Sequence, residues 1–370
     1  MADTGKGKRQ RPCQSLAVRD RNPEGGFHEA ALVFCPQPSI HGAPSGIIAN
    51  RRNSHDQGSV SRVKPEMKVS FAGLELTNPV IAASGTFGYG IEFEEILSLE
   101  RIGGFVTKGI SLEPIAGHAA PRIVQTAAGM INAIGLQNVG VEEFITHKLP
   151  PLRRYPRCNV IVNVFGYTEG DYIAVIEQLN QAKGIAAYEL NVSCPNVHSG
   201  GMTFGADPGS LEYLVTRAKK ASTRPLIVKL SPNVTSIAHM AKIAADAGAD
   251  AVSLTNTFLA ISIDAETRRP RLSNITGGLS GPAIKPIALR MVYETARAVT
   301  IPILGMGGIM TPADAVEFLL AGATAVEVGT ASFADPCAVE RLATGLESWC
   351  RSHNVAKVSA LTGALELPHD

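Results

Sequence analysis

The sequence predicts a TIM (β/α)8 barrel, and the first observation behind this prediction is a repeating pattern of apolar runs. From Met67 onward, eight short runs alternate with stretches of helical pattern over roughly 280 residues, a usual length for this fold. Each run is almost continuously apolar, as expected for parallel strands buried on both faces. The runs cover residues 80–83, 104–108, 159–164, 187–192, 226–230, 251–254, 303–306 and 325–328.

The second observation is that residues able to bind a ligand or take part in catalysis follow these runs. In a TIM barrel the active site lies at the carboxyl ends of the strands. The first six runs end in, or are followed by, polar or charged residues: Ser84, Lys108, Asn163, Asn191, Cys194, Lys229, Thr255, Asn256 and Thr257. The last two runs are followed by Gly307-Gly308 and by Gly329-Thr330, where barrels often bind a phosphate through backbone amides.

An open, doubly wound sheet is the competing fold. It predicts a G-x-G-x-x-G turn after the first strand, and residues 84–88 match that pattern poorly. Helices are expected between the runs, for example at 210–222 and 236–247. A small hairpin is expected at 69–76, where apolar residues alternate around a glycine.

Two connections, 109–156 and 258–282, are longer than a barrel requires. Both contain glycine-rich or polar segments, including residues 129–135 and 276–281. Long loops in a compact domain usually serve a function or lack order. We therefore expect these connections to form lids or walls around a substrate.

Composition excludes several classes of function. The net charge is 34 − 33 = +1, which gives no indication of a nucleic-acid or membrane-surface partner. We find no apolar run long enough to span a membrane. The six cysteines form no C-x-x-C pair, so we expect no metal or iron–sulfur site built by this chain and reduced, cytoplasmic thiols.

Residues 1–66 differ in character from the rest. They contain ten Lys and Arg against six Asp and Glu, with many Gly, Pro, Ser and Asn residues. This composition predicts a largely disordered extension before a folded domain at 67–370. A targeting peptide is the alternative, but the interspersed acidic residues argue against it.

Cys194 and two lysines are the strongest candidates for chemistry. A thiol has an ordinary pKa of about 8.5, so Cys194 can act as a general base where thiolate is favoured. The alternative is that it serves as a small buried hydrophobic residue. Lys108 and Lys229 would be costly to bury unpaired. Each either stabilises negative charge on a ligand or pairs with a structural carboxylate such as that of Glu189.

Several segments together closely resemble class 1 dihydroorotate dehydrogenases, from Met67 to about Leu367. The resemblance rests on Asn-Ala-Ile-Gly-Leu-Gln-Asn at 132–138, Asn-Val-Ser-Cys-Pro-Asn at 191–196, Lys-Leu-Ser-Pro-Asn at 229–233, and the glycine turns after the last two runs. The membrane-associated class 2 enzymes have a serine where this chain has Cys194. Residues 198–208 are similar to the NAD-linked type 1B rather than the fumarate-linked type 1A.

The resemblance implies oxidation of dihydroorotate to orotate on FMN, in pyrimidine biosynthesis. Cys194 would remove a proton from ring carbon 5 while a hydride leaves ring carbon 6 for the flavin. The residues implied to hold FMN are Ser84, Lys108, Gly109, Asn163, Asn191, Lys229, Thr255, Gly281, Gly307, Gly308, Gly329 and Thr330. Those implied to face the substrate are Lys108, Asn132, Ala133, Ile134, Gly135, Leu136, Asn191, Asn256 and Thr257.

Type 1B also implies a partner subunit that carries FAD and a 2Fe-2S cluster and relays electrons to NAD. The expected assembly is a heterotetramer of two catalytic and two electron-transfer chains. Three alternatives stay open at this point. The chain could be a type 1A enzyme that uses fumarate, a flavoenzyme like dihydropyrimidine dehydrogenase, or a flavin-binding scaffold without catalysis.

Overall fold

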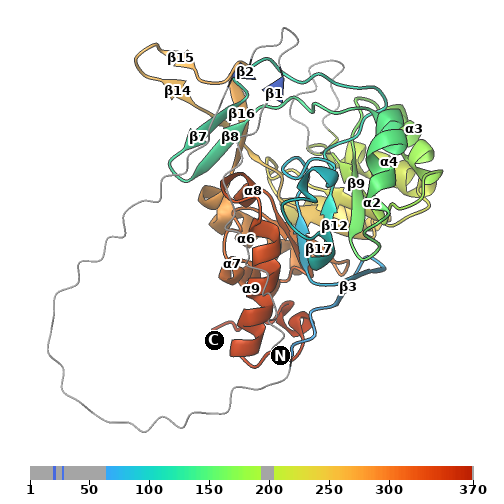
Figure 1. Ribbon diagram of the computed structural model, residues 1–370, viewed down its shortest axis with the longest axis vertical. Helices are drawn as coiled ribbons and strands as arrows, with labels where there is room; N and C mark the ends of the chain where they lie inside the picture. The colour runs from blue at the N-terminus through green and yellow to red at the C-terminus, as the bar shows by residue number, and fades with distance from the viewer. Residues whose placement is uncertain (1–19, 22–26, 29–63, 193–203, 369–370) are drawn as a thin grey trace, which may run out of the picture.

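A computed structural model describes residues 20–21, 27–28, 64–192 and 204–368. Within these residues, eight parallel strands close into a barrel with helices around it, which confirms the predicted fold (Figure 1). The strands in chain order are β5 (Val80–Ala82), β6 (Gly104–Val106), β9 (Asn159–Val164), β10 (Ala187–Asn191), β11 (Leu226–Lys229), β12 (Ala251–Leu254), β17 (Ile303–Met306) and β18 (Ala325–Val328).

The order of the strands around the barrel follows their order in the chain. Each of these strands pairs with the next along the chain, and β18 pairs with β5 to close the circle. Every residue of these strands is buried except the first residue of β9, which explains the apolar runs in the sequence. Because the strands are parallel and in sequence, all their carboxyl ends meet at one mouth.

Helices form the outer layer, and four of the longer ones in the described residues begin at a side-chain cap. Reciprocal capping boxes start α3 (Glu169–Asn180), between Thr168 and Asp171, and α7 (Pro312–Leu320), between Thr311 and Asp314. The longer helices are α3 (Glu169–Asn180), α4 (Pro208–Ala221), α5 (Ile237–Asp246), α6 (Lys285–Ala296), α7 (Pro312–Leu320) and α9 (Ala338–Ser352). Shorter ones are α1 (Val141–Glu143), η3 (Phe144–Lys148), α2 (Leu149–Leu152), α8 (Ala331–Ala334), η1 (Ile91–Phe93), η2 (Leu99–Arg101), η4 (Pro282–Ile284) and η5 (Val358–Leu361).

The predicted hairpin at 69–76 is present as β3 (Val69–Phe71) and β4 (Leu74–Leu76). Glu66, one residue before the predicted boundary at Met67, is hydrogen-bonded to the C-terminal part of the chain. The amide of Glu66 donates to the carbonyl of Ala356, and its carbonyl accepts from the amide of Val358. Within residues 1–63, only β1 (Asp20–Arg21) and β2 (Phe27–His28) are described, so the disordered extension stays a prediction.

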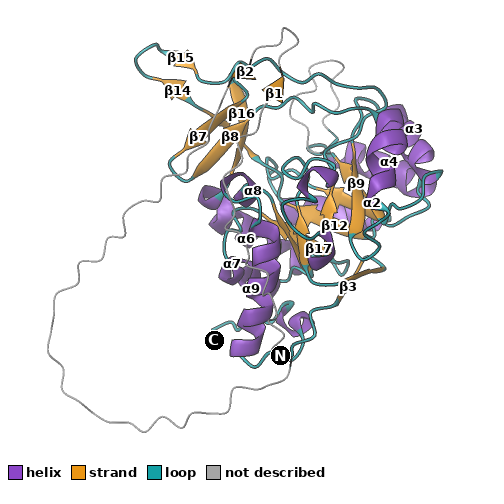
Figure 2. Cartoon of the chain, in the orientation of Figure 1, coloured by secondary structure: helices purple, strands orange, loops and turns teal. Residues whose placement is uncertain are grey.

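The two long connections, expected to form lids or walls around a substrate, pair with each other (Figure 2). They build an antiparallel sheet in the order β13-β16-β8-β7. Its strands are β13 (Phe258–Ile261), β16 (Thr276–Ser280), β8 (Gly129–Asn132) and β7 (Ile123–Thr126), and β14 (Ile263–Asp264) pairs with β15 (Arg269–Pro270) beyond it. Figure 1 shows this sheet and β3 at opposite ends of the barrel.

Candidate active site at the barrel mouth

Three of the predicted site residues sit side by side on neighbouring strands. Asn191 ends β10 directly opposite Lys229, the last residue of β11. Its side-chain amide donates to Oδ1 of Asn163 on β9, at 3.4 Å. All three side chains are at least nine-tenths buried. The carboxyl ends of these strands therefore gather two amides and a cation at one place, as predicted.

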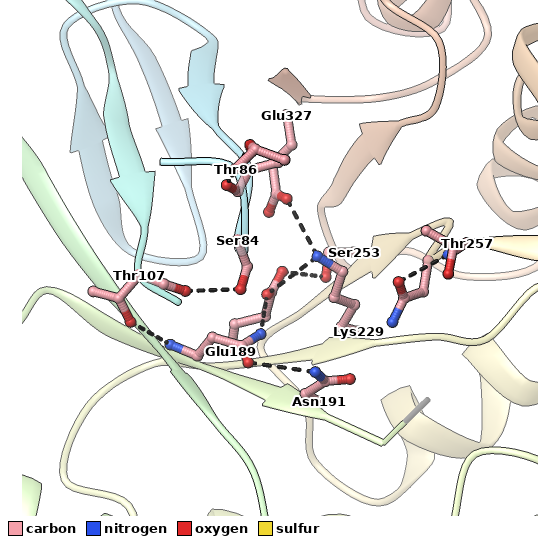
Figure 3. Close-up of polar contacts among 12 residues, drawn as sticks. Ser84, Thr86, Thr107, Glu189, Asn191, Lys229, Ser253, Thr257 and Glu327 are labelled. Carbon is pink, nitrogen blue, oxygen red and sulfur yellow. Dashed lines mark hydrogen bonds and ion pairs between the residues drawn. The ribbon is translucent and has the colours of Figure 1, made fainter. Parts of the chain in front are cut away.

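Below these residues lies a buried charged cluster (Figure 3). Glu189 accepts hydrogen bonds from Asn163 Nδ2 at 2.6 Å and from Ser253 Oγ at 2.7 Å. Lys229 Nζ lies 3.5 Å from one oxygen of Glu189 and 3.6 Å from Glu327 Oε2. Burial alone would lower the pKa of Lys229, but its interactions with Glu189, first of all, and with Glu327 outweigh burial and raise it, so Lys229 is a cation.

Lys229 pairs with Glu189, as one of the two alternatives expected. It is also the last residue of β11, so the pairing still leaves its charge beside a ligand at the mouth. Sequence reasoning missed Glu327 and Ser253. The available signal was a glutamate inside the apolar run 325–328 and a serine inside 251–254. A polar residue in a doubly buried strand needs a partner, but the pattern does not say which partner.

The first strand ends join the same network. Ser84 Oγ donates to the carbonyl of Thr107 at 2.7 Å, and Thr107 Oγ1 accepts from the amide of Asn163 at 3.2 Å. A Cβ on Gly109 would lie 3.0 Å from Asn163 Oδ1, so the glycine lets the chain pass close to that amide. Lys108 follows β6 and is half-buried.

Glycines bring three turns into close contact on the other side of the mouth. Gly281, Gly307 and Gly308 all have positive φ, at 98°, 130° and 77°. A Cβ on Gly308 would lie 2.8 Å from the carbonyl oxygen of Gly281. Gly329 lies against Ala83, and Thr330 Oγ1 donates to Ser280 Oγ at 2.8 Å. Backbone amides grouped in this way are suited to an anion such as phosphate.

The predicted substrate residues come together from the long connections and the end of β12. Asn132, the last residue of β8, donates to the carbonyl of Gly278 on β16 at 3.4 Å. Gly278 packs so closely on Thr257 that a Cβ there would collide with the threonine side chain. The amide of Thr257 in turn donates to Asn256 Oδ1 at 2.8 Å.

The segment that follows Asn132 is supported by a histidine that sequence reasoning missed. The carbonyls of Ala133 and Ile134 accept from Nδ1 and the backbone amide of His118, both at 3.1 Å. Gly135 and Leu136 follow with positive φ of 72° and 56°. The side chain of Ala133 is buried, so this residue can offer a ligand only backbone atoms.

Asn233 is a second supporting residue whose role the sequence did not reveal, although it belongs to the Lys-Leu-Ser-Pro-Asn segment. Its side chain donates to the carbonyl of Thr257 at 3.1 Å and accepts from the amide of Leu259 at 3.0 Å. Asn233 therefore bridges the backbone on both sides of Phe258 and holds the segment that carries Asn256 and Thr257.

Cys194, the predicted base, lies outside the described residues, as does most of the segment that resembles type 1B. The description resumes at Phe204, whose ring packs edge-on against Tyr172 at 5.8 Å between centroids. The Tyr172 hydroxyl donates to the carbonyl of Asn191 at 2.8 Å, three residues before Cys194 in the sequence.

Comparison with known proteins shows which family the chain belongs to. The family model for dihydroorotate dehydrogenase matches residues 66–349. The chain belongs to the dihydroorotate dehydrogenase family. It is 56% identical over 304 residues to the proteins named dihydroorotate dehydrogenase B (NAD(+)), catalytic subunit, of Citrifermentans bemidjiense and Pelobacter propionicus. Each alignment covers 82% of this chain, and 99% and 100% of the respective relative.

A third relative carries a different name. The protein of Solibacter usitatus, 54% identical over 302 residues, is named for a dihydroorotate dehydrogenase A that uses fumarate. That alignment covers 82% of this chain and 99% of the relative. Membership of the dihydroorotate dehydrogenase family is therefore clear, whereas overall identity does not separate the two types.

The mouth fits FMN, the cofactor that the resemblance implies. The Thr255 hydroxyl is buried and has no hydrogen-bond partner in the described part of the chain. Its oxygen would lie 3.6 Å from a Cβ placed on Gly307, so it sits beside the glycine turns. A buried hydroxyl is normally hydrogen-bonded, and a polar cofactor held by those turns would supply the partner.

We expect Gly308→Ala to weaken FMN binding because its Cβ would press against the backbone oxygen of Gly281. The dissociation constant for FMN, measured by flavin fluorescence, should rise about tenfold or more. Gly363→Ala is the matched control, since Gly363 has a similar φ of 70° but no atom within 4 Å of the added Cβ. Equal FMN affinity in the two variants would contradict the assignment of the glycine turns.

Proposed function

We propose that this chain is a catalytic subunit that oxidises dihydroorotate to orotate with FMN, in de novo pyrimidine biosynthesis. The observation that carries the proposal is the arrangement of the barrel mouth in a member of this family. Glycine turns suited to a phosphate lie on one side, asparagine amides lie on the other, and the buried Lys229 cation lies between their strands.

The asparagines suit the substrate. Orotate is a planar ring with hydrogen-bond donors and acceptors on its edges and one carboxylate. The neutral amides of Asn132, Asn191 and Asn256 both donate and accept, so they can match those edges without adding charge. The carboxylate of the substrate is a partner for Lys108 or for the backbone amides around Gly135.

The reaction removes a hydride from ring carbon 6 and a proton from ring carbon 5, which leaves the double bond of orotate. FMN, when bound, supplies the acceptor for the hydride. Cys194, as thiolate, takes the proton from ring carbon 5. The Lys229 cation stabilises negative charge at the mouth, because it lies in a water-poor interior where charges interact strongly.

We further propose that electrons leave through a partner subunit carrying FAD and a 2Fe-2S cluster, with NAD as final acceptor, in a heterotetramer of two plus two chains. The printed names of the relatives from Citrifermentans and Pelobacter, which specify NAD(+) and a catalytic subunit, support this proposal. We also propose that the protein is cytoplasmic, where pyrimidine biosynthesis would use it. In the described residues no helix is long and apolar enough to cross a membrane.

Cys194→Ala tests the proposed function directly. The purified variant should keep the yellow colour of bound flavin, yet dihydroorotate should bleach it about 10²–10⁴-fold more slowly than wild type at neutral pH, in anaerobic stopped-flow measurements. Because thiolate is the base, the wild-type rate should rise with pH through the pKa of Cys194. Cys337→Ala, a half-buried thiol at the start of α9, is the control and should bleach at the wild-type rate. An unchanged rate in Cys194→Ala would refute the mechanism.

The fumarate-linked type is the second candidate, and the name of the Solibacter relative is the observation that keeps it open. The purified chain should reduce fumarate slowly when given dihydroorotate. Adding the electron-transfer subunit should make dihydroorotate reduce NAD, followed as NADH absorbance. Rapid reduction of fumarate by the chain alone, with no gain from the added subunit, would favour the fumarate-linked type instead.

A further inference from the structure

The barrel interior contains a cluster of one lysine and two glutamates that the proposed chemistry uses only in part. Lys229, Glu189 and Glu327 are 5%, 0% and 1% exposed. They come from β11, β10 and β18, and β18 stands three positions from β11 and four from β10 in the eight-stranded barrel. Glu327 therefore reaches Lys229 from the opposite wall, and Figure 3 shows the lysine between the two carboxylates.

The two carboxylates have different surroundings. Glu189 accepts hydrogen bonds from Asn163 and Ser253, one on each oxygen, in addition to its ion pair with Lys229. In the described part of the chain no donor gives a hydrogen bond to either oxygen of Glu327, its contact with Lys229 is 3.6 Å long, and its carboxyl group faces that of Glu189. Donors directed at a carboxylate favour its ionised form, so the surroundings favour ionisation of Glu189 over that of Glu327.

The charge count points the same way. If both glutamates were ionised, one negative charge in the closed interior would have no counter-charge. Isolated buried charge is strongly unfavourable, and buried groups take up or lose a proton instead. One proton on the cluster makes it neutral, and the hydrogen bonds of Glu189 leave Glu327 as the group that holds this proton.

We propose that Glu327 is a neutral carboxylic acid that acts as a positioning residue, holding Lys229 from across the barrel while Glu189 alone balances its charge. This inference deepens the proposed function, because it rests on FMN binding beside Lys229. With Glu327 neutral, the cluster has no net negative charge. It therefore does not disfavour negative charge that develops on a ligand at the mouth.

The expected titration agrees with this geometry. Burial raises the pKa of Glu327 well above its ordinary value, and the charge of Glu189 raises it further, while Lys229 lowers it in part. Glu189 and Lys229 are the charged groups that face it in the described residues. When a group has a higher pKa in the folded state than in the unfolded state, the free energy of unfolding falls as pH rises from the unfolded-state pKa to the folded-state pKa. Glu327 therefore makes the wild-type chain less stable at higher pH.

The presence of the proton is tested by infrared spectroscopy on the full chain as purified. At neutral pH, the wild type should show the carbonyl stretch of a protonated carboxylic acid, and Glu327→Gln should lack it. A wild-type spectrum without this band, or a band that survives in Glu327→Gln, would overturn the proposal. The measurement reports on the cluster with or without flavin, so it remains informative if FMN binding itself fails.

Which glutamate holds the proton is tested by comparing Glu327→Gln with Glu189→Gln in denaturant unfolding. An amide resembles a neutral acid, so Glu327→Gln should be as stable as wild type at acidic pH and more stable than wild type at neutral pH, where the wild type must take up a proton to fold. Glu189→Gln removes the counter-ion of Lys229 and should be less stable than wild type. The reverse order of the two variants would assign the proton to Glu189 and overturn the proposal.

The positioning role is tested by FMN affinity. Glu327→Leu keeps most of the volume but removes the polar group, so Lys229 loses its support from β18. The dissociation constant for FMN should rise about tenfold in Glu327→Leu and stay within about threefold of wild type in Glu327→Gln. Equal affinity in the two variants would refute the positioning role. Absence of FMN binding by the wild type would refute the proposed function instead.

Discussion

The buried ion pair between Lys229 and Glu189 is the interaction on which the barrel mouth depends. A lysine at the end of a doubly buried strand is tolerated only with a counter-ion close by. Glu189 supplies that counter-ion and also accepts hydrogen bonds from Asn163 and Ser253, so one carboxylate fixes side chains from three neighbouring strands. Asn191 is then oriented through Asn163. The polar groups facing the mouth therefore rest on a charged layer inside the barrel.

Two parts of the fold form the mouth: the turns that follow the barrel strands, and the antiparallel sheet formed by the two long connections. The turns after β17 and β18 are glycine-rich and present backbone atoms, which suits the phosphate of a cofactor. The sheet formed by the long connections presents side chains such as Asn132, which suits a small ring with many polar edges. His118 and Asn233 hold the backbone of the substrate side from outside, and so fix side chains that would otherwise sit on long loops.

The sequence predicted the barrel well because each strand is buried on both faces and therefore reads as an apolar run. All eight runs became strands of the described barrel, with ends that differ by no more than two residues. The antiparallel sheet was not predicted, since its strands β8 and β16 lie far apart in the chain and contain glycines that weaken a strand pattern. The sequence shows Glu327 as an acidic residue in an apolar run. It does not show that Glu327 faces Lys229, because that contact forms only when the barrel closes. That the Thr255 hydroxyl has no hydrogen-bond partner among the described residues could likewise be learned only from the three-dimensional structure.

A mouth with the proposed function takes electrons specifically from dihydroorotate into a bound flavin. The most direct measurement is an anaerobic titration of the FMN-loaded chain with dihydroorotate, following flavin absorbance and the orotate formed, with dihydrouracil as the comparison substrate. We expect dihydroorotate to bleach the flavin, with one orotate formed for each flavin reduced, and dihydrouracil to bleach it far more slowly. A flavin that dihydroorotate leaves unbleached, or that dihydrouracil bleaches equally fast, would contradict the proposed function.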